Sequence, residues 1–177
     1  ETFLTKAAGE DKPFFMYLAF NAPHDPRQSP KEFVDKYPLD KIAVPPSFLP
    51  EYPFKDAIGC GKGLRDEKLA PFPRTEYAVK VNRQEYYAII THMDAQVGRI
   101  MATLKKTGAD KDTVVVLWGD HGWHLGEHAI WGKHSLFEEA LHSPLIIRFP
   151  GIGKPGAKTD AVVSTLDIFP TLCELTN

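Results

Sequence analysis

Acidic, basic and imidazole side chains gather in residues 113–133, whose sequence is TVVVLWGDHGWHLGEHAIWGK. Asp120 and His121 directly follow an apolar run, and Lys133 lies one loop further on. Four of the chain's seven histidines fall in or just after this stretch: His121, His124, His128 and His134. A carboxylate, an imidazole and an ammonium group with this spacing could converge on one anion or one metal ion. The pattern therefore predicts a functional site here.

The apolar run that leads into these residues predicts the element that positions them. Residues 113–118 are β-branched or apolar, which is typical of a short strand buried on both faces. Gly119, Gly122 and Gly126 then allow backbone turns that other residues resist. Ligands of open α/β sheets bind beyond the carboxyl ends of the strands, so we expect the chemistry at this strand's end.

A second apolar run ends in the same way. Residues 13–20, PFFMYLAF, also read as a strand, and His24 follows it in the sequence NAPHDP. Pro23 and Pro26 fix φ on either side of His24 and should hold its imidazole on a stiff loop. Each of the two predicted strands is thus followed by a histidine, and His24 becomes a candidate catalytic residue.

The segment from His124 to His128 also matches H-x-x-E-H, the spelling of inverted zinc peptidases. In those enzymes two histidines four residues apart on one helix bind zinc. Gly122 and Gly126 make this segment a poor helix, and it follows a predicted buried strand closely. The pattern therefore disfavours the zinc peptidase.

The rest of the chain alternates between predicted helices and strands. The clearest helix covers 83–106, where apolar residues recur every three or four positions and Gly108 follows as a C-terminal cap. The other expected elements are helices at 1–8, 29–37 with Ser29 as its cap, 135–140 and 167–175 with Cys173 in the core, and strands at 144–149 and 159–164. Such alternation favours an α/β fold with a largely parallel sheet and helices on both faces.

One long stretch lacks periodicity. Residues 39–81 are proline-rich and are expected to form a surface excursion that rims a substrate pocket or serves as a structural insertion. We therefore expect residues 1–177 to be one α/β domain with this excursion. Because residues 1–8 look like the end of a helix without its start, the chain is expected to be a fragment of a longer chain.

Composition excludes some classes of function. The 177 residues are 43% hydrophobic and 25% charged, which is ordinary for a globular domain. A net charge of -2 does not provide the excess of positive charge that is typical of proteins that bind nucleic acid. No run approaches the roughly 20 apolar residues of a membrane span. Two cysteines do not define a disulfide framework.

Three short tracts carry a resemblance to a known family. Gly119-Asp120-His121-Gly122, Leu125-Gly126-Glu127-His128 and Trp131-Gly132-Lys133 resemble the carboxyl-terminal metal-and-sulfate motif of type I sulfatases, in the alkaline phosphatase superfamily. The Asp-His pair is similar to that of the iduronate-2-sulfatase and choline-sulfatase branches. The P-H-x-P context of His24 resembles the family's histidine that binds sulfate or protonates the leaving oxygen.

The resemblance implies an alkaline phosphatase/sulfatase-like fold, incomplete in this chain, and the hydrolysis of a sulfated small molecule or glycan. It implies that Asp120 and His121 are ligands of a divalent metal, most simply Ca²⁺, for which the carboxylate is the easier ligand. It implies that Lys133 contacts the sulfate, that His24 binds sulfate or acts as general acid, and that His128 contributes to substrate binding. It also implies a periplasmic, secreted or lysosomal protein whose partner is the rest of the catalytic domain.

One departure from the family stands out. The family's nucleophile is a formylglycine made from Cys or Ser in a C-x-P-S-R-like motif, and neither Cys60 nor Cys173 has that context. The formylglycine is therefore expected upstream of these residues. Two alternatives stay open: a phosphodiesterase or phosphonate hydrolase of the same superfamily, and a non-catalytic module that binds sulfated glycans.

Overall fold

The computed structural model describes residues 1–176 and is organised along one long helix, α4 (Glu76–Lys106). The side chain of Thr75 caps this helix by accepting a hydrogen bond from the Ala78 amide. Gly108 follows its end at φ 77°, the left-handed conformation expected of a C-terminal glycine. The predicted helix is therefore confirmed, and it begins at Glu76 rather than Arg83. The proline-rich excursion correspondingly ends at Thr75.

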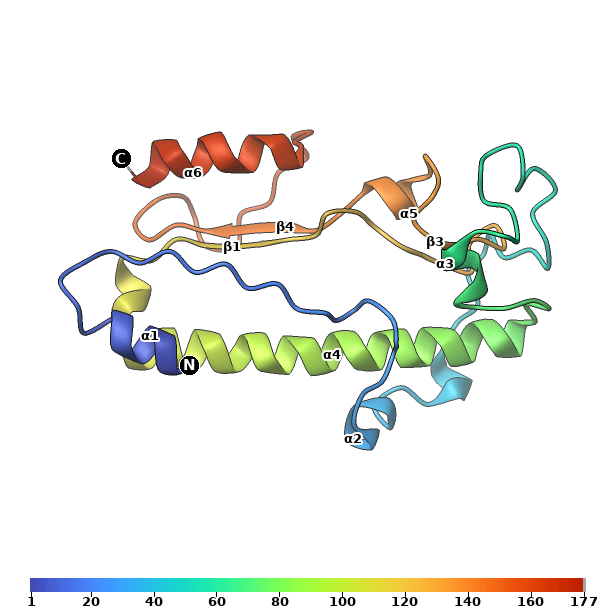
Figure 1. The fold of residues 1–177 in the computed structure, drawn as a ribbon, viewed down its shortest axis with the longest axis horizontal. Helices are drawn as coiled ribbons and strands as arrows, with labels where there is room; N and C mark the ends of the chain where they lie inside the picture. Colours follow the sequence, from blue (N-terminus) through green and yellow to red (C-terminus); the bar gives the residue numbers. More distant parts are fainter. Residues whose placement is uncertain (177) are drawn as a thin grey trace.

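Two strands form a layer between helices (Figure 1). β1 (Val115–Trp118) pairs with β4 (Leu145–Arg148), and Val116 lies opposite Ile147. α4 lies on one side of this pair, and α6 (Ile168–Thr176) lies on the other. The pairing is antiparallel, whereas the sequence pattern predicts a largely parallel sheet. Mixed α/β sheets commonly contain antiparallel pairs, so this pair is compatible with the predicted α/β class.

The remaining elements are short. They are α1 (Thr2–Ala7), α2 (Lys31–Val34), α3 (Arg65–Lys68), α5 (Glu138–Leu141), β2 (His124–Leu125), β3 (Trp131–Gly132) and the 3₁₀ turns η1 (Leu39–Lys41), η2 (Ala109–Lys111) and η3 (Thr165–Asp167). β2 and β3 pair with each other in a second antiparallel pair. None of the helices among residues 1–176 is long and apolar enough to cross a membrane.

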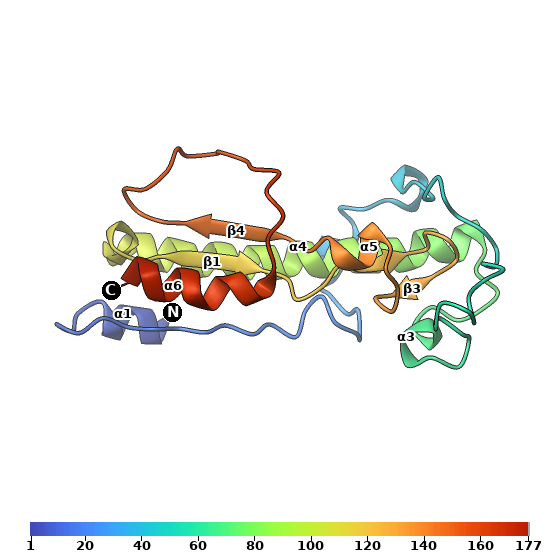
Figure 2. The same cartoon turned by 90° about the horizontal axis from the view of Figure 1, so that it is seen from above.

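Two of the predicted strands are wrong. Residues 13–20 are extended but hydrogen-bond to no strand, and the side chains of Phe15 and Tyr17 are largely exposed. Residues 159–164 also form no strand, and Val162 is fully exposed. In Figure 2 the 13–20 segment, in blue, runs along the side of β1 that faces away from β4. An apolar, β-branched run supplies strand propensity, but a strand forms only where a neighbour pairs with its backbone.

Three smaller expectations are also wrong. β1 is not buried on both faces, because Leu117 and Trp118 are partly exposed. Ser29 makes no capping bond, and Pro30 occupies the cap position of α2. Cys173 is exposed rather than in the core, since nothing among residues 1–176 covers its side of α6.

A buried ion cluster lies under the excursion. Glu67, on α3, is fully buried and pairs with the ammonium of Lys55 and the guanidinium of Arg74. Both cations also donate to the backbone carbonyl of Ala129. The Glu67 carboxylate accepts a hydrogen bond from the Trp131 amide at 2.9 Å. The excursion therefore fixes the loop that leads to Lys133, and it is not a detached insertion.

Candidate active site at the end of strand β1

The turn after β1 places Asp120 and His121 side by side. Nε2 of His121 lies 3.6 Å from Oδ2 of Asp120, and Nδ1 of His121 donates to the Gly122 carbonyl at 2.7 Å. Because Nδ1 donates that bond, Nε2 is the ring nitrogen left to bind a ligand, and it lies on the side of the Asp120 carboxylate. A carboxylate oxygen and a ring nitrogen placed in this way could bind the same cation.

Gly122 is required for this geometry. Its amide donates to the Ala140 carbonyl at 2.8 Å, which ties the turn to α5. A Cβ atom at this position would lie 2.2 Å from the Glu139 carbonyl oxygen. Any side chain here would therefore push the turn, and His121 with it, away from α5.

Trp123 connects His121 to Lys133. The His121 ring stacks on Trp123 with 6.0 Å between centroids, and Nζ of Lys133 lies 5.8 Å from the centroid of the same indole. On the α4 side, Tyr86 stacks on Trp123 at 6.5 Å and 14°. Burial, together with the nearby Asp25 carboxylate, raises the pKa of Tyr86 to about 12, so its hydroxyl stays protonated.

His24 approaches from the loop after the extended segment. Its Nδ1 donates to the Asp25 carbonyl at 2.8 Å, and Nη2 of Arg65 lies 3.5 Å from its Nε2. Among residues 1–176 no direct contact joins His24 to Asp120, His121 or Lys133. Tyr86 stacks on Trp123 on one side, and the Asp25 carboxylate beside the His24 loop contributes to its raised pKa.

His128 has a different environment. Its ring stacks on Phe137 at 4.6 Å and also contacts Tyr52, while its amide donates to the Ser47 carbonyl. Its backbone is in the left-handed region at φ 53°. The structure does not bring His128 against the other candidate residues, and its role in substrate binding stays a prediction.

The structure supports the rejection of a zinc peptidase. The residues from His124 to His128 form β2 and a turn rather than a helix. His124 is fully buried and its Nε2 bonds to the Ser135 hydroxyl at 2.7 Å, while burial lowers its pKa. No group of three or more potential metal ligands occurs within residues 1–176.

Cys60 is poorly suited to act as a nucleophile. Cys60 is fully buried and donates to the His134 carbonyl. Burial, with the Glu67 charge as a second cause, raises the pKa of its thiol, which disfavours the reactive thiolate. Cys173 lies on α6. Cys60 therefore does not fit the nucleophile that the resemblance implies, and the expectation that the nucleophile lies outside these residues stays a prediction.

Trp123 and Tyr86 are not among the residues that the sequence pattern singles out. Tyr86 belongs to the apolar stripe of α4 and looks like a core residue in the sequence. Trp123 stands between His121 and His124, and this position inside the motif is the sequence feature that could have identified it as a site residue. Their joint role depends on stacking between residues 37 positions apart, which only the fold reveals.

Comparison with known proteins decides the family. All of residues 1–177 match the sequence model of the sulfatase family. The chain belongs to the sulfatase family. A sulfatase from Formosa agariphila is 38% identical over 170 residues, which cover 93% of this chain and 32% of that protein. Human iduronate 2-sulfatase is 30% identical over 209 residues, with 97% and 37% covered.

A solved structure confirms the fold class of this sulfatase chain. The phosphonate monoester hydrolase of Agrobacterium radiobacter superposes with a TM-score of 0.83 at 28% identity, covering 97% of this chain and 36% of that one. The expected α/β fold of alkaline phosphatase/sulfatase type is therefore confirmed. The chain spans about a third of the length of the relatives it matches.

Proposed function

We propose that these residues are part of a sulfuric ester hydrolase that acts on a sulfated small molecule or a sulfated glycan. The observation that carries the proposal is the turn after β1, where Asp120 and His121 face each other at 3.6 Å. The Trp123 indole stacks on His121 and also lies near the Lys133 ammonium. The proposed cation-binding pair and a positive charge are therefore close to the same indole ring. Membership in the sulfatase family gives this arrangement its reaction class.

The donor set fits part of a divalent metal site. Asp120 offers a largely exposed carboxylate, and His121 offers Nε2 because its Nδ1 is engaged by the Gly122 carbonyl. Ca²⁺ takes about six to eight oxygen ligands, so further ligands must join these two. A bound cation of this kind supplies charge that stabilises the sulfate oxygens.

Lys133 and His24 supply the remaining chemistry of this chain. Lys133 would hold a sulfate oxygen through its ammonium, since fixed charges stabilise a transferring anionic group best. Nδ1 of His24 is engaged by the Asp25 carbonyl, so proton donation or sulfate binding would occur at Nε2, which lies beside Arg65. The stacked Trp123 and Tyr86 would keep water from one side of Lys133.

The nucleophile of the reaction is expected outside these residues. The formylglycine that the family implies has no counterpart at Cys60 or Cys173, so no step through it is assigned to this chain. Residues 1–177 alone would then not hydrolyse a sulfate ester, because covalent catalysis does not survive loss of its nucleophile.

The test uses the full-length protein that contains these residues. Purified protein is assayed for sulfate release from 4-nitrophenyl sulfate and from a panel of monosaccharide sulfates. Turnover with kcat/KM well above that for a phenylphosphonate monoester and a phosphodiester supports the proposal. Binding of sulfated sugars without any turnover would instead show a non-catalytic binding module.

One observation favours a second candidate. The superposition with a phosphonate monoester hydrolase at a TM-score of 0.83 makes phosphonate ester hydrolysis the alternative activity. The same assay distinguishes the two, because a phosphonate monoester would then be the better substrate by kcat/KM.

A further inference from the structure

Lys133, the candidate sulfate-binding cation, is not tethered by an acidic partner of its own. Its Nζ lies 5.8 Å from the centroid of the Trp123 indole. Among residues 1–176 no carboxylate pairs with this ammonium, whereas the next residue, His134, pairs with Asp66. A lysine ammonium is a point charge on a flexible stem, and it stabilises a transferring anion best where its position is fixed in advance. The position of Lys133 must therefore come from the backbone on either side of it.

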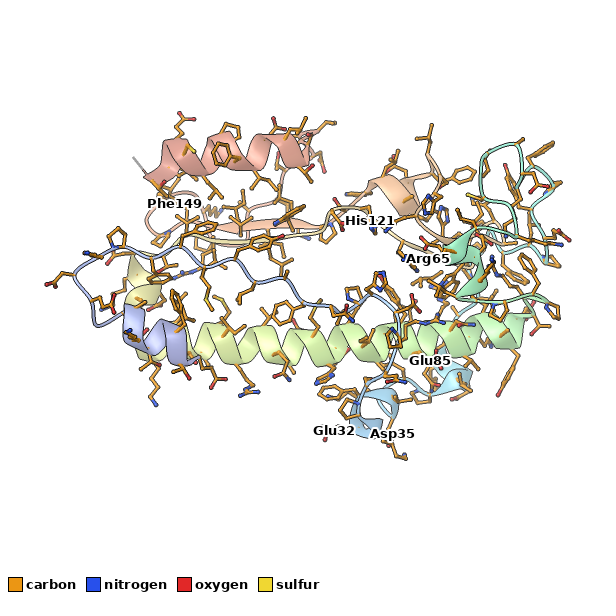
Figure 3. The ribbon with its side chains drawn as sticks, in the orientation of Figure 1. Glu32, Asp35, Arg65, Glu85, His121 and Phe149 are labelled. Carbon is orange, nitrogen blue, oxygen red and sulfur yellow. The ribbon has the colours of Figure 1, made fainter. Side chains whose placement is uncertain are left out.

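Asp66 packs against the residue that precedes Lys133. α3, which carries Asp66, lies against β3, which ends at Gly132 (Figures 1 and 2). Figure 3 shows Arg65, the neighbour of Asp66 on α3, in the same half of the molecule as His121. A Cβ atom at Gly132 would lie 2.7 Å from Cβ of Asp66, and this glycine has φ 98°. Gly132 therefore lets the Asp66 side chain lie directly on the backbone that leads into Lys133.

Asp66 also holds the residue that follows Lys133. Its side chain is 1% exposed, and its Oδ1 accepts hydrogen bonds from Nε and Nη2 of Arg65 at 2.9 and 2.8 Å. Its Oδ2 is buried, forms no hydrogen bond of good geometry within residues 1–176 and lies 3.2 Å from Nε2 of His134. A buried carboxylate oxygen without another partner is stabilised by the imidazole beside it. One buried side chain thus contacts both neighbours of Lys133.

The imidazole of His134 is not needed to hold the loop together. Its side chain is 46% exposed, so it adds little to the packing of the core. The backbone here has other partners, because the Cys60 thiol donates to the His134 carbonyl and the Ser135 amide donates to the Lys133 carbonyl at 2.9 Å. Removal of the imidazole should therefore release the contact with Asp66 and leave the loop folded.

We propose that His134 and Asp66 are positioning residues for Lys133. Their ion pair holds the backbone around Lys133, so that its ammonium stays beside the Trp123 indole and ready to bind an anion. The inference rests on the proposed function, since it concerns the cation that would bind the sulfate. His134 and Asp66 make no bond to the substrate in this account, and their effect on turnover passes through Lys133.

The kinetic test is a double-mutant cycle in the full-length protein. The wild type, His134→Ala, Lys133→Ala and the variant with both changes are assayed with the sulfate ester that the wild type hydrolyses best. His134→Ala is expected to lower kcat/KM roughly 10- to 100-fold, the scale of a misplaced catalytic group. In the Lys133→Ala background the same change should cost almost nothing, because the group that His134 positions is absent. Equal losses in the two backgrounds, or wild-type kinetics in His134→Ala, would overturn the proposal.

Two further variants separate positioning from a general loss of structure. His134→Gln should recover part of the lost kcat/KM, because its amide can donate to Oδ2 of Asp66. His142→Ala is the matched control, since His142 also pairs with a carboxylate, that of Glu138 at 3.8 Å, but on the surface. It should leave kcat/KM unchanged. Melting temperatures verify that each variant is folded.

A second measurement does not depend on activity. Lysines of the full-length protein are reductively methylated with ¹³C-formaldehyde, and the NMR resonance that is missing from Lys133→Ala identifies Lys133. The ring current of Trp123 should shift this resonance away from those of exposed lysines. In His134→Ala and Asp66→Asn the resonance should move toward theirs, and in His142→Ala it should not. An unchanged resonance in both variants of the pair would overturn the positioning role. If the resonance moves as expected but the wild type hydrolyses no sulfate ester, the proposed function alone fails.

Discussion

At the scale of single residues, Asp120 and His121 are the pair that we propose as ligands of a metal ion. Asp120→Asn keeps the shape of the side chain but removes the negative charge that a hard cation requires. We expect Ca²⁺ affinity of the full-length protein to fall at least roughly tenfold, and turnover to fall with it. Calorimetric titration with Ca²⁺ measures the affinity directly.

Two further variants sharpen this prediction. His121→Ala should weaken Ca²⁺ binding less than Asp120→Ala, because Ca²⁺ prefers oxygen ligands. Asp160→Asn removes an exposed carboxylate on another loop and should leave the titration unchanged. A wild-type Ca²⁺ affinity in Asp120→Asn would show that Asp120 is not a metal ligand. A larger loss of Ca²⁺ affinity in His121→Ala than in Asp120→Ala would reverse the ranking of the two ligands.

His124 gives a prediction about pH. Burial lowers its pKa in the folded state from the ordinary value of 6.5. Between that lowered value and 6.5 the unfolded chain binds more protons than the folded chain, so stability falls as pH falls below 6.5. Urea unfolding of the full-length protein at a series of pH values measures this slope. His124→Gln should reduce the slope of unfolding free energy against pH by up to the contribution of one bound proton. An unchanged slope would show that His124 does not cause it.

At the scale of elements, α3 joins the two halves of the site. Asp66 pairs with His134 next to Lys133, Arg65 reaches His24, and Glu67 holds the backbone of Trp131. A helix of four residues thus connects the candidate acid to the strand that precedes the candidate cation. Its own stability comes from the buried ion cluster rather than from its length.

Glu67→Gln should therefore be strongly destabilising. It leaves Lys55 and Arg74 buried without their shared carboxylate, a loss on the order of 3–5 kcal/mol for one partner of a buried ion pair. Denaturant unfolding of the full-length protein measures the change. Glu138→Gln, at a highly exposed glutamate, is the matched control and should cost almost nothing. A similar small cost for both variants would mean that the cluster does not anchor the excursion.

Local sequence patterns predicted the helices, strands and turns that are specified by residues close together in the chain. The apolar stripe of α4 and the run of β1 each specify their own element, and the Gly-Asp-His tract marks the turn that carries the candidate metal ligands. Residues 13–20 show the limit, because strand propensity does not supply the neighbour that a strand requires. The Lys55–Glu67–Arg74 cluster could not be predicted, since its members look like ordinary surface charges until the fold brings them together at Ala129.

At the scale of the whole molecule, apolar side chains lie open on the central layer. Phe15, Tyr17, Leu117, Trp118 and Ile146 are all exposed on the extended segment and the β1–β4 pair. Large exposed apolar surfaces on a soluble domain mark places where other parts of a protein pack. The chain spans about a third of its relatives, so the rest of a catalytic domain is the expected cover.

Residues 1–177 expressed alone should therefore self-associate, bind Ca²⁺ weakly and release no sulfate. Adding the remainder of the catalytic domain, in the same chain or as a second fragment, should restore a monodisperse species and activity. Sedimentation velocity and sulfate release measure the two properties. A monomeric, active 177-residue chain, shown by mass to carry no other polypeptide, would contradict both the incomplete layer and the missing nucleophile.

The most direct test of the central claim is sulfate release by the full-length protein and by its Lys133→Ala variant, followed by ion chromatography. Lys111→Ala, at an exposed lysine outside the site, is the control. The account predicts that the wild type and the control release sulfate from a sulfate ester at equal rates. Lys133→Ala should show kcat/KM lower by roughly 10²–10³, the scale of one lost electrostatic contact to the transferring group. No release by the wild type, or equal release by all three proteins, would contradict it.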